Sequence, residues 1–275
     1  MKLSLQGPSG SGKTIGALKL AKGLAGSLDQ VAVIDTENGS SHLYAHMGDF
    51  SVFSMEAPYT PEMFIQAVDT AVKEGFKCII IDSLSHEWFG TGGILDIHSS
   101  MVGNSFANWS KLTPRHNALI NTIVKAPVHI IATFRSKTDY VIQQVNGKSV
   151  PEKVGLKAIA REDSEYEFTV AFELNRNYVA NVTKDRTGMF VNQPELRITE
   201  AIGAQIASWC SLGDVQEKSE QAKIQDCNSI DELESLLADK PDVRDALREQ
   251  VSTKMEDLLM VQQYKYQQNG HYHGK

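Results

Sequence analysis

Three glycines, a lysine and a threonine near the start of the chain are spaced as in a phosphate-binding loop. The pattern G-x-x-x-x-G-K-[ST] is matched at every position by Gly7, Pro8, Ser9, Gly10, Ser11, Gly12, Lys13 and Thr14. A loop that directs several backbone N–H groups at clustered negative charge needs glycine where a Cβ would clash or where φ must be positive. These eight residues therefore predict a site for a nucleoside triphosphate, and ATP is the expected ligand.

Two side chains of the loop are expected to act on the phosphates and on a metal ion. Lys13 should reach the β- and γ-phosphates as a point charge, and the Thr14 hydroxyl should ligate Mg²⁺. The helix expected at residues 15–24 starts here, so its dipole adds to the attraction for an anion. ATP and Mg²⁺ are thus the two expected cofactors.

Two acidic residues follow apolar runs that are expected as buried strands. Glu37 comes shortly after residues 30–35, and Asp82 ends residues 77–82. Ligands of open α/β sheets bind outside the carboxyl ends of the strands, so both carboxylates should face the phosphate loop. Asp82 has the form of a Walker B acid, which hydrogen-bonds Mg²⁺-bound water beside the loop threonine. Many buried strands end in Asp without a metal role, but the position of this one, two strands after the loop, favours the metal.

The elements that must hold these residues alternate between strand and helix. Strands are expected at residues 2–6, 30–35, 50–55, 77–82 and 128–133. Helices are expected at residues 15–24, 60–75 and 109–125. Pro114 should bend or restart the last helix. Residues 166–182 alternate in hydrophobicity on either side of Asn175-Arg176-Asn177, which predicts an antiparallel hairpin. The fold class is α/β, a mostly parallel sheet flanked by helices with an added antiparallel hairpin and a small C-terminal helical segment.

Two segments outside these elements contain glycines and aromatic residues, and the second of them also contains several cations. Residues 85–101 contain Trp88 and are expected as an irregular, mobile loop near the crevice. Residues 138–163 are expected as a long basic loop, of the kind that is usually functional or disordered. Their cations include Lys148, Lys153, Lys157 and Arg161. Arg135, just after the last expected strand of the parallel sheet, brings a further cation to the nucleotide edge.

The net charge of −7 is confined to the C-terminal part of this 275-residue chain. Residues 214–260 hold 13 Asp and Glu against 6 Lys and Arg, so the remainder is neutral and can still carry a basic patch. No run approaches the roughly 20 apolar residues of a membrane span, and the chain enters a strand too early for a signal peptide. Three cysteines lie too far apart for the common zinc spacings. We therefore expect a cytoplasmic protein with no membrane partner.

Composition also predicts how the chain divides. A nucleotide-binding core is expected at residues 1–212, followed by a charged linker with few large apolar side chains at residues 213–225. Residues 226–260 should form an acidic pair of amphipathic helices, and residues 261–275, with their glutamines and histidines, should be a disordered tail. The acidic segment is equally explained as a solvated helical pair, as a module that docks a partner, or as a competitor of nucleic acid.

The order of these motifs resembles the core of the RecA-like recombinases, which are P-loop ATPases. It runs from the phosphate loop through the strands that lead to Glu37 and Asp82, and on to a strand followed by a polar residue, a basic loop and a hairpin. The chain looks closest to the phage-encoded, single-domain RecA-like ATPases that act in single-strand annealing and recombination. The resemblance covers residues 1–212, and it implies a RecA-like ATPase core there.

The resemblance assigns roles to residues that match the family's motifs. Glu37 stands where the family keeps the glutamate that orients the attacking water, and Asp82 takes the Walker B role. Arg135 occupies the place of the polar residue that senses the γ-phosphate and signals to the DNA-binding loop, although RecA has an amide there. Residues 182–186 are similar to the RecA segment that sends two cations into the neighbouring subunit's nucleotide, which makes Lys184 and Arg186 catalytic in trans. A solvated hairpin end is the alternative for these two cations.

The function implied by the resemblance is a DNA-dependent ATPase of phage-type recombination and repair. Such a protein binds single-stranded DNA, promotes annealing or strand exchange in the host cytoplasm, self-associates with its nucleotide site at a subunit interface, and meets a single-strand binding protein. Residues 85–108 and 137–161 would face the DNA, with Trp88 or Tyr140 stacking on bases. Two alternatives stay open. One is a ring-forming helicase or motor ATPase of the RecA class, and the other is a nucleotide-gated DNA-binding module in which hydrolysis is incidental.

Overall fold

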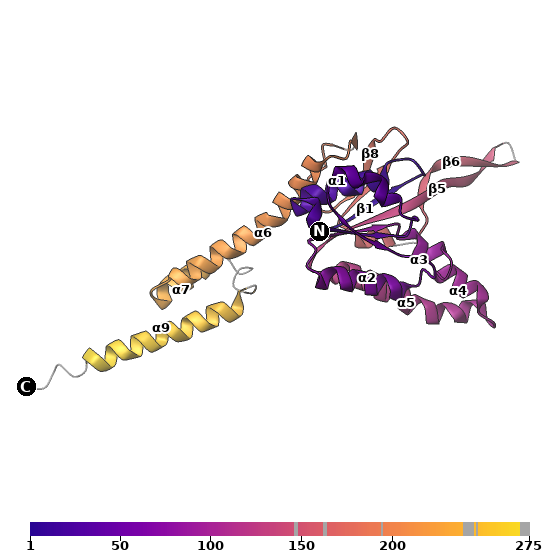
Figure 1. Ribbon diagram of the computed structural model, residues 1–275. Helices are drawn as coiled ribbons and strands as arrows, with labels where there is room; N and C mark the ends of the chain where they lie inside the picture. The colour runs from indigo at the N-terminus through magenta and orange to yellow at the C-terminus, as the bar shows by residue number, and fades with distance from the viewer. Residues whose placement is uncertain (146–147, 162–163, 194, 239–244, 246, 270–275) are drawn as a thin grey trace, which may run out of the picture. The chain divides into compact units, whose positions relative to one another are not determined.

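Nine strands form one sheet within the residues that the structure describes, which are 1–145, 148–161, 164–193, 195–238, 245 and 247–269 (Figure 1). This computed structural model divides into two units, Met1–Ala207 and Ser208–Lys275, and the sheet belongs to the first. The parallel part of the sheet runs in the order β3 (Ser51–Ser54), β2 (Val31–Asp35), β4 (Cys78–Asp82), β5 (His129–Val145), β1 (Lys2–Gly7) and β7 (Val170–Leu174). Every residue of β2 and β4 is buried, as expected for parallel strands that are covered on both faces.

The register aligns the functional strand ends at one edge of this sheet. Gly7 of β1 pairs with Arg135 of β5, and Asp35 of β2 pairs with Asp82 of β4. The nucleotide-side ends of β1, β2 and β4 and the middle of β5 therefore meet beside the loop that follows Gly7. This arrangement confirms the α/β fold class with a mostly parallel sheet.

Antiparallel pairing extends the sheet at two places. β8 (Ala180–Asp185) pairs with β7 and with the short β9 (Glu195–Leu196), which confirms the hairpin expected after the parallel strands. The expectation of a long loop at residues 138–163 is wrong, because β5 continues to Val145 and pairs with β6 (Lys148–Ala158) in a projecting hairpin (Figure 1). Residues 138–142 include Thr, Tyr, Val and Ile, which favour a strand and outweigh the lysines and glycines nearby.

Helices cover both faces of the parallel strands. α1 (Lys13–Ala25) lies on one face, and α2 (Pro61–Lys73) and α5 (Ser105–Lys125) lie on the other (Figure 1). The Thr60 hydroxyl caps α2 by accepting a hydrogen bond from the backbone N–H of Met63 at 3.4 Å. α5 continues as one helix through Pro114, so there is no restart at that residue, and Asn104 caps its start by accepting hydrogen bonds from two backbone N–H groups.

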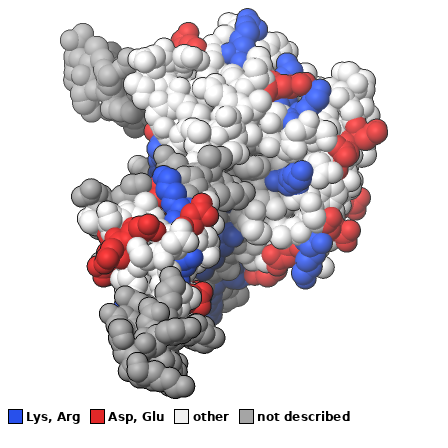
Figure 2. All heavy atoms as spheres, turned by 90° about the vertical axis from the view of Figure 1, so that its left-hand side faces the viewer, with Lys and Arg blue, Asp and Glu red and all other residues white. Residues whose placement is uncertain are grey.

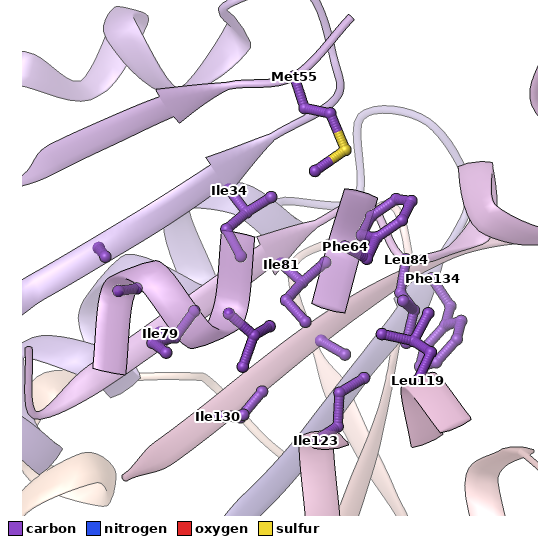
Figure 3. Close-up of a cluster of buried hydrophobic side chains, with 14 of the residues drawn as sticks. Ile34, Met55, Phe64, Ile79, Ile81, Leu84, Leu119, Ile123, Ile130 and Phe134 are labelled. Atoms are coloured by element: carbon purple, nitrogen blue, oxygen red, sulfur yellow. The ribbon is translucent and has the colours of Figure 1, made fainter. Parts of the chain in front are cut away.

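One hydrophobic cluster joins α2 and α5 to the sheet face that they cover (Figure 3). Alternate residues of three strands contribute to it, as strand geometry requires. The cluster includes Ile34, Phe64, Ile79, Ile81, Leu119, Ile123, Ile130 and Phe134. Burial of a side chain of this size stabilises the fold by about 1.5–3 kcal/mol. The cluster therefore fixes β2, β4 and β5 in the order that brings their polar ends together.

Most of residues 85–101 are helical, so the expectation of an irregular loop is wrong. They form α3 (Ser85–Phe89) and α4 (Ile94–Ser100), separated by a turn that contains three glycines. The carboxylate of Asp96 closes this turn by accepting a hydrogen bond from the backbone N–H of Gly92 at 2.7 Å. The glycines thus separate two short helices, whereas the sequence pattern predicted that the whole segment has no regular secondary structure.

The second unit is helical, and its first helix replaces the expected linker. α6 (Glu200–Asp226) runs through residues 213–225 without a break. Residues 214–226 contain neither glycine nor proline and are rich in Glu, Gln, Lys and Ala, which favour helix. α7 (Ile230–Ala238) and α9 (Arg248–Asn269) follow and share a core that includes Leu233, Leu237 and Val251. Because α9 continues to Asn269, the expected disordered tail is helical over residues 261–269, and residues 270–275 lie outside the described part.

The described helices and the described surface bear on possible partners. No helix in the described part of the chain is both long enough and apolar enough to cross a bilayer. Figure 2 shows acidic and basic side chains side by side on the face that it presents. A nucleic-acid site on that face would therefore have to be local, because charges of both signs share the surface.

Candidate nucleotide site

The phosphate loop connects β1 to α1 and has a backbone that only its glycines allow. Gly10 and Gly12 have φ values of +78° and +84°, which residues with a side chain rarely adopt. A Cβ at Gly7 would lie 2.4 Å from Oγ of Ser11. Oγ of Ser11 is itself buried and has no hydrogen-bond partner among the described residues. A narrow cradle with an unmatched hydroxyl fits a phosphate group.

Lys13 turns its ammonium back into this loop. Nζ donates hydrogen bonds of 3.0 Å to the carbonyl oxygens of both Gly7 and Pro8. Burial lowers the pKa of Lys13, and the carboxylates of Asp82 and Glu37 act in the opposite direction. The charge is therefore held where phosphates would enter, with carbonyl oxygens as its present partners.

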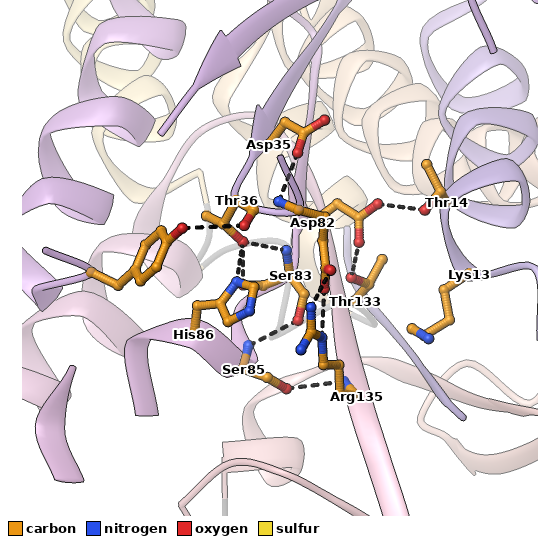
Figure 4. Close-up of polar contacts among 12 residues, drawn as sticks. Lys13, Thr14, Asp35, Thr36, Asp82, Ser83, Ser85, His86, Thr133 and Arg135 are labelled. Carbon is orange, nitrogen blue, oxygen red and sulfur yellow. Dashed lines mark hydrogen bonds and ion pairs between the residues drawn. The ribbon is translucent and has the colours of Figure 1, made fainter. Parts of the chain in front are cut away.

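Thr14, Asp82 and Thr133 form the corner where a divalent ion would bind. Oγ1 of Thr14 donates to Oδ2 of Asp82 at 2.6 Å, and Oγ1 of Thr133 donates to Oδ1 at 2.5 Å (Figure 4). Burial raises the pKa of the Asp82 carboxyl, and the two hydroxyl groups counter that shift. The described residues contain no group of three or more His, Cys, Asp and Glu that could hold a metal, so Mg²⁺ would depend on Thr14, Asp82 and the phosphates of a nucleotide.

A cavity of about 460 Å³ joins the loop to the ends of the neighbouring strands. The hydroxyl groups of Ser40 and Ser136 in its wall are buried and have no hydrogen-bond partner within the described part of the chain. The cavity is lined by Ser9, Gly10, Gly12, Lys13, Thr14, Glu37, Ser40, Tyr44, Asp82, Arg135, Ser136 and Ile159. Buried polar atoms normally have partners, so these two serines fit a polar ligand.

Glu37 and Arg135 form an ion pair inside this cavity. Nε of Arg135 donates to Oε1 of Glu37 at 2.7 Å, and Nη2 donates to Oε2. The hydrogen bond to Glu37 is the main cause that raises the pKa of Arg135. The guanidinium also lies 5.6 Å from the ring centroid of Phe89, and the backbone N–H of Arg135 donates to Oγ of Ser85 at 2.9 Å. Glu37 and Arg135, which the sequence predicts beside the nucleotide, thus bind each other.

Asp35 shapes the turn that carries Glu37, a role that the sequence did not indicate. Its buried carboxylate accepts a hydrogen bond from the backbone N–H of Glu37 at 2.7 Å. It also accepts hydrogen bonds from the backbone N–H and the hydroxyl of Ser41, at 2.9 and 2.5 Å. Asp35 therefore fixes the direction in which Glu37 leaves β2. The available signal was its place at the end of an apolar run, the same signal that identified Asp82.

Thr36 ties the ends of β2 and β4 together. Its Oγ1 donates to the carbonyl oxygen of Ser83 at 3.1 Å and accepts from the backbone N–H of Ser83 at 2.8 Å (Figure 4). Nδ1 of His86 lies 2.7 Å from the same hydroxyl. Burial lowers the pKa of His86, and the charge of Arg135 lowers it further. This buried network sets the spacing between the two strands that carry the acidic residues of the site.

The match to a known protein family is to the AAA domain and spans residues 1–196, which include the loop and the acidic residues just described. The chain belongs to the AAA domain family. With its mostly parallel sheet and its phosphate loop, this AAA domain has the α/β fold of a P-loop nucleotide-binding protein. Among solved structures, the chain is similar to the KaiC-like protein PH0186 of the archaeon Pyrococcus horikoshii OT3, with a TM-score of 0.40 and 16% identity over 67% of this chain and 80% of that one. No curated protein matches the chain.

Lys184 and Arg186 of the AAA domain lie away from its own phosphate loop. Asp185 between them pairs with Val170, and Val170 pairs with Leu3 at the amino end of β1, whereas the loop follows the carboxyl end of β1. The two side chains point the same way, since both donate to the carbonyl oxygen of Tyr166, Arg186 at 2.9 Å. They therefore do not join Lys13 in the nucleotide cavity of the same chain.

A second cavity of the AAA domain, of about 680 Å³, combines indole rings with cations. Trp88 and Trp109 stack with ring centroids 5.8 Å apart. Nη1 of Arg161 is buried and has no hydrogen-bond partner among the residues that the structure describes. The lining residues are Trp88, Leu95, Trp109, Thr113, Lys137 and residues 157–161. The side chains of Tyr140, Lys148 and Lys153, which were also expected to face DNA, lie outside the described part.

Proposed function

We propose that this AAA domain protein is an ATPase stimulated by single-stranded DNA, and that it acts in phage-type DNA recombination and repair by annealing or strand exchange. The observation that carries the proposal is the ion pair of Glu37 with Arg135 in the same cavity as Lys13, Thr14 and Asp82. An acid that can orient water, a cation, a phosphate-binding lysine and a metal corner are the groups that ATP hydrolysis needs.

The residues of the cavity divide the reaction between them. Lys13 and the loop N–H groups bind the β- and γ-phosphates, and Thr14 and Asp82 would hold Mg²⁺, which would supply positive charge to the phosphates. Arg135 turns from Glu37 to the γ-phosphate and frees the carboxylate. Glu37 accepts a proton from water as the water oxygen bonds to the γ-phosphorus. The bond from this phosphorus to the β–γ bridging oxygen breaks, which leaves ADP and inorganic phosphate.

The second cavity supports single-stranded DNA as the stimulating ligand. Base–aromatic stacking accepts any base, and cations nearby neutralise the backbone. Trp88 and Trp109 offer the rings, while Lys137 and the unmatched Nη1 of Arg161 offer positive charge. The projecting β5–β6 hairpin begins at the wall of the same cavity, since Lys137 and Lys157 are paired across it. A strand of DNA could therefore follow the hairpin into the cavity.

Helix α3 provides a physical link between the two cavities. Ser85 at its start accepts a hydrogen bond from the backbone of Arg135, and Phe89 at its end lies under the Arg135 guanidinium. Trp88, one residue before Phe89, lines the second cavity. A base that displaces Trp88 would move α3 and so change its contacts with Arg135. The ion pair between Arg135 and Glu37 would then change as well.

The hydrolysis is tested by ATP turnover and ATP affinity in matched variants. Lys13→Ala should abolish ATP binding, because the loop loses its charge. Glu37→Gln should lower turnover by about 10²- to 10⁴-fold, the usual contribution of a general base, and keep ATP affinity. Retained affinity in Lys13→Ala would refute the site, and retained turnover in Glu37→Gln would leave a nucleotide-gated binding module with incidental hydrolysis.

The DNA dependence is tested by adding single-stranded oligonucleotides to the same assay. Turnover should rise with DNA, and Trp88→Ala should weaken DNA binding by about 5- to 100-fold, the range of one stacked base. Trp209→Ala, which removes an exposed tryptophan in the second unit, is the matched control and should behave as wild type. Turnover that ignores DNA, or equal DNA affinity in both variants, would contradict the proposal.

A ring-forming helicase or motor ATPase is the second candidate, because Lys184 and Arg186 lie near the amino end of β1, away from their own phosphate loop, as cations for a neighbouring subunit would. The two candidates differ in their action on DNA. An annealing factor should pair complementary strands and leave a tailed duplex intact. A helicase should unwind that duplex with ATP.

A further inference from the structure

The strand order limits where the nucleoside of a bound triphosphate can lie, given the ATPase function proposed above. Asp82, Glu37 and Arg135 belong to β4, the turn after β2, and β5, which all lie on one side of β1 in the sheet. The reacting phosphate must lie on that side, beside the acid and the metal corner. The other end of the triphosphate then points across the loop toward β7 and β8, on the opposite side of β1.

An exposed aromatic ring stands on that opposite side. Tyr178 lies in the turn between β7 and β8, and 56% of its surface is exposed. The ring packs on the phosphate loop itself, since a Cβ at Gly12 would lie 2.7 Å from Cδ1 of Tyr178. The glycine that shapes the loop thus also makes room for this ring.

The backbone at Tyr178 is strained and is held by specific hydrogen bonds. Its φ is +60°, a region that aromatic residues rarely adopt. Oδ1 of Asn175 accepts hydrogen bonds from the backbone N–H groups of Asn177 and Val179 at 2.8 and 3.1 Å. The backbone N–H of Tyr178 donates to the carbonyl oxygen of Asn175 at 3.1 Å. Strain of this kind persists where the surroundings enforce it and often marks a ligand site.

We propose that Tyr178 is the platform on which the nucleobase of the bound triphosphate stacks. The ring is fixed beside the loop, faces solvent, and lies on the side that the nucleoside must reach. Tyr44, the aromatic residue that lines the main cavity, belongs to the segment that follows Glu37 after β2, on the other side of β1 from Tyr178. Stacking depends on ring area more than on hydrogen-bond pattern, so Tyr178 contributes affinity for purine nucleotides in general.

The test compares ligands with and without a base. Calorimetry measures the affinity of the full chain for Mg·ATP and for Mg·tripolyphosphate in wild type, Tyr178→Asn and Tyr178→Phe. Asn tolerates positive φ, so the first variant removes the ring and keeps the turn. Tyr178→Asn should bind ATP about 5- to 100-fold more weakly and should bind tripolyphosphate as wild type does. Tyr178→Phe should bind both ligands as wild type does.

The controls separate this inference from the proposed function. Unchanged ATP affinity in Tyr178→Asn, or an equal loss for ATP and tripolyphosphate, would overturn the stacking platform and leave the ATPase in place. Retained tripolyphosphate binding also reports that the variant is folded. Lys13→Ala should lose both ligands, and its retention of both would overturn the nucleotide site and the platform together.

Discussion

Arg135 donates hydrogen bonds to both carboxylate oxygens of Glu37, although neither residue is fully buried: 41% of the Arg135 side chain and 20% of the Glu37 side chain are exposed. The pair is therefore accessible to a ligand that competes for the guanidinium. A γ-phosphate is such a ligand, since Arg binds phosphate and carboxylate with the same planar fork.

Variants of this pair should not act independently. Arg135→Gln should lower ATP turnover by about tenfold or more, because Glu37 loses its orientation and the phosphate loses a cation. The double variant Glu37→Gln/Arg135→Gln should turn over ATP about as slowly as Glu37→Gln alone, since residues that work as a unit give non-additive losses. Single-turnover hydrolysis measures all three, with ATP affinity as the control. Losses that multiply would contradict a shared task.

Asp35 should matter for turnover more than for nucleotide affinity. Asp35→Asn replaces one acceptor oxygen by an NH₂ group that faces the N–H donors of the Glu37 turn. The lost hydrogen bonds should destabilise the protein by about 1–3 kcal/mol and misdirect Glu37. We expect a fall in kcat with little change in KM, measured well below the unfolding temperature.

A second carboxylate variant controls for the Asp35 measurement. Asp96→Asn changes an exposed residue that also accepts a hydrogen bond from a turn N–H group, far along the chain from the site. It should keep wild-type kcat. Equal kcat in Asp35→Asn and wild type would mean that the turn holds Glu37 without this carboxylate.

The sequence predicts those parts of the site that follow either from a contiguous motif or from the topology of a parallel sheet. The phosphate loop is one contiguous motif whose glycines and lysine have separate physical reasons. Glu37 and Asp82 follow from the rule that parallel strands bring their carboxyl ends together. Arg135 follows from the same rule, although β5 runs on past it to Val145.

The remaining parts depend on contacts between distant segments, which no local pattern records. Thr133 meets Asp82 and Tyr178 meets Gly12 only after the sheet has assembled. Residues 213–225 have the composition of a linker because they lack an apolar stripe, although most residues from Gln216 to Gln225 are Glu, Gln, Lys or Ala, which favour helix. The sequence pattern does not predict the hairpin after Arg135, because the lysines and glycines in it usually indicate a loop.

His129 should make the stability of the fold depend on pH. Burial is the main cause that lowers its pKa to about 4 from 6.5, and the N-terminal ammonium, 3.1 Å from Nδ1, and Lys2 lower it further. The unfolded chain then binds more protons between these two values, so the free energy of unfolding should fall as the pH drops from 6.5 to about 4. Above pH 6.5 the free energy of unfolding is not reduced by protonation of His129 in the unfolded chain.

Chemical denaturation across that range measures the effect. His129→Gln should flatten the dependence on pH, because a neutral amide replaces the titrating ring. His42→Gln, at an exposed histidine, should keep the wild-type slope. If His129→Gln and wild type lose stability in parallel on acidification, another group is responsible.

Lys184 and Arg186 should complete the nucleotide site of a neighbouring subunit. They lie near the amino end of β1, whereas their own phosphate loop follows its carboxyl end, and their side chains point the same way, so an assembly would be needed to bring them to a triphosphate. Glu37→Gln and Lys184→Ala/Arg186→Ala proteins should each be slow alone. Mixed in equal amounts, about a quarter of the interfaces in a random assembly join an intact acid to intact cations, and turnover should recover toward that fraction.

Lys13→Ala mixed with Glu37→Gln is the matched control, because each chain then carries a defect in its own site and no neighbour can repair it. Equal rates in the two mixtures would place the cations at a solvated hairpin end.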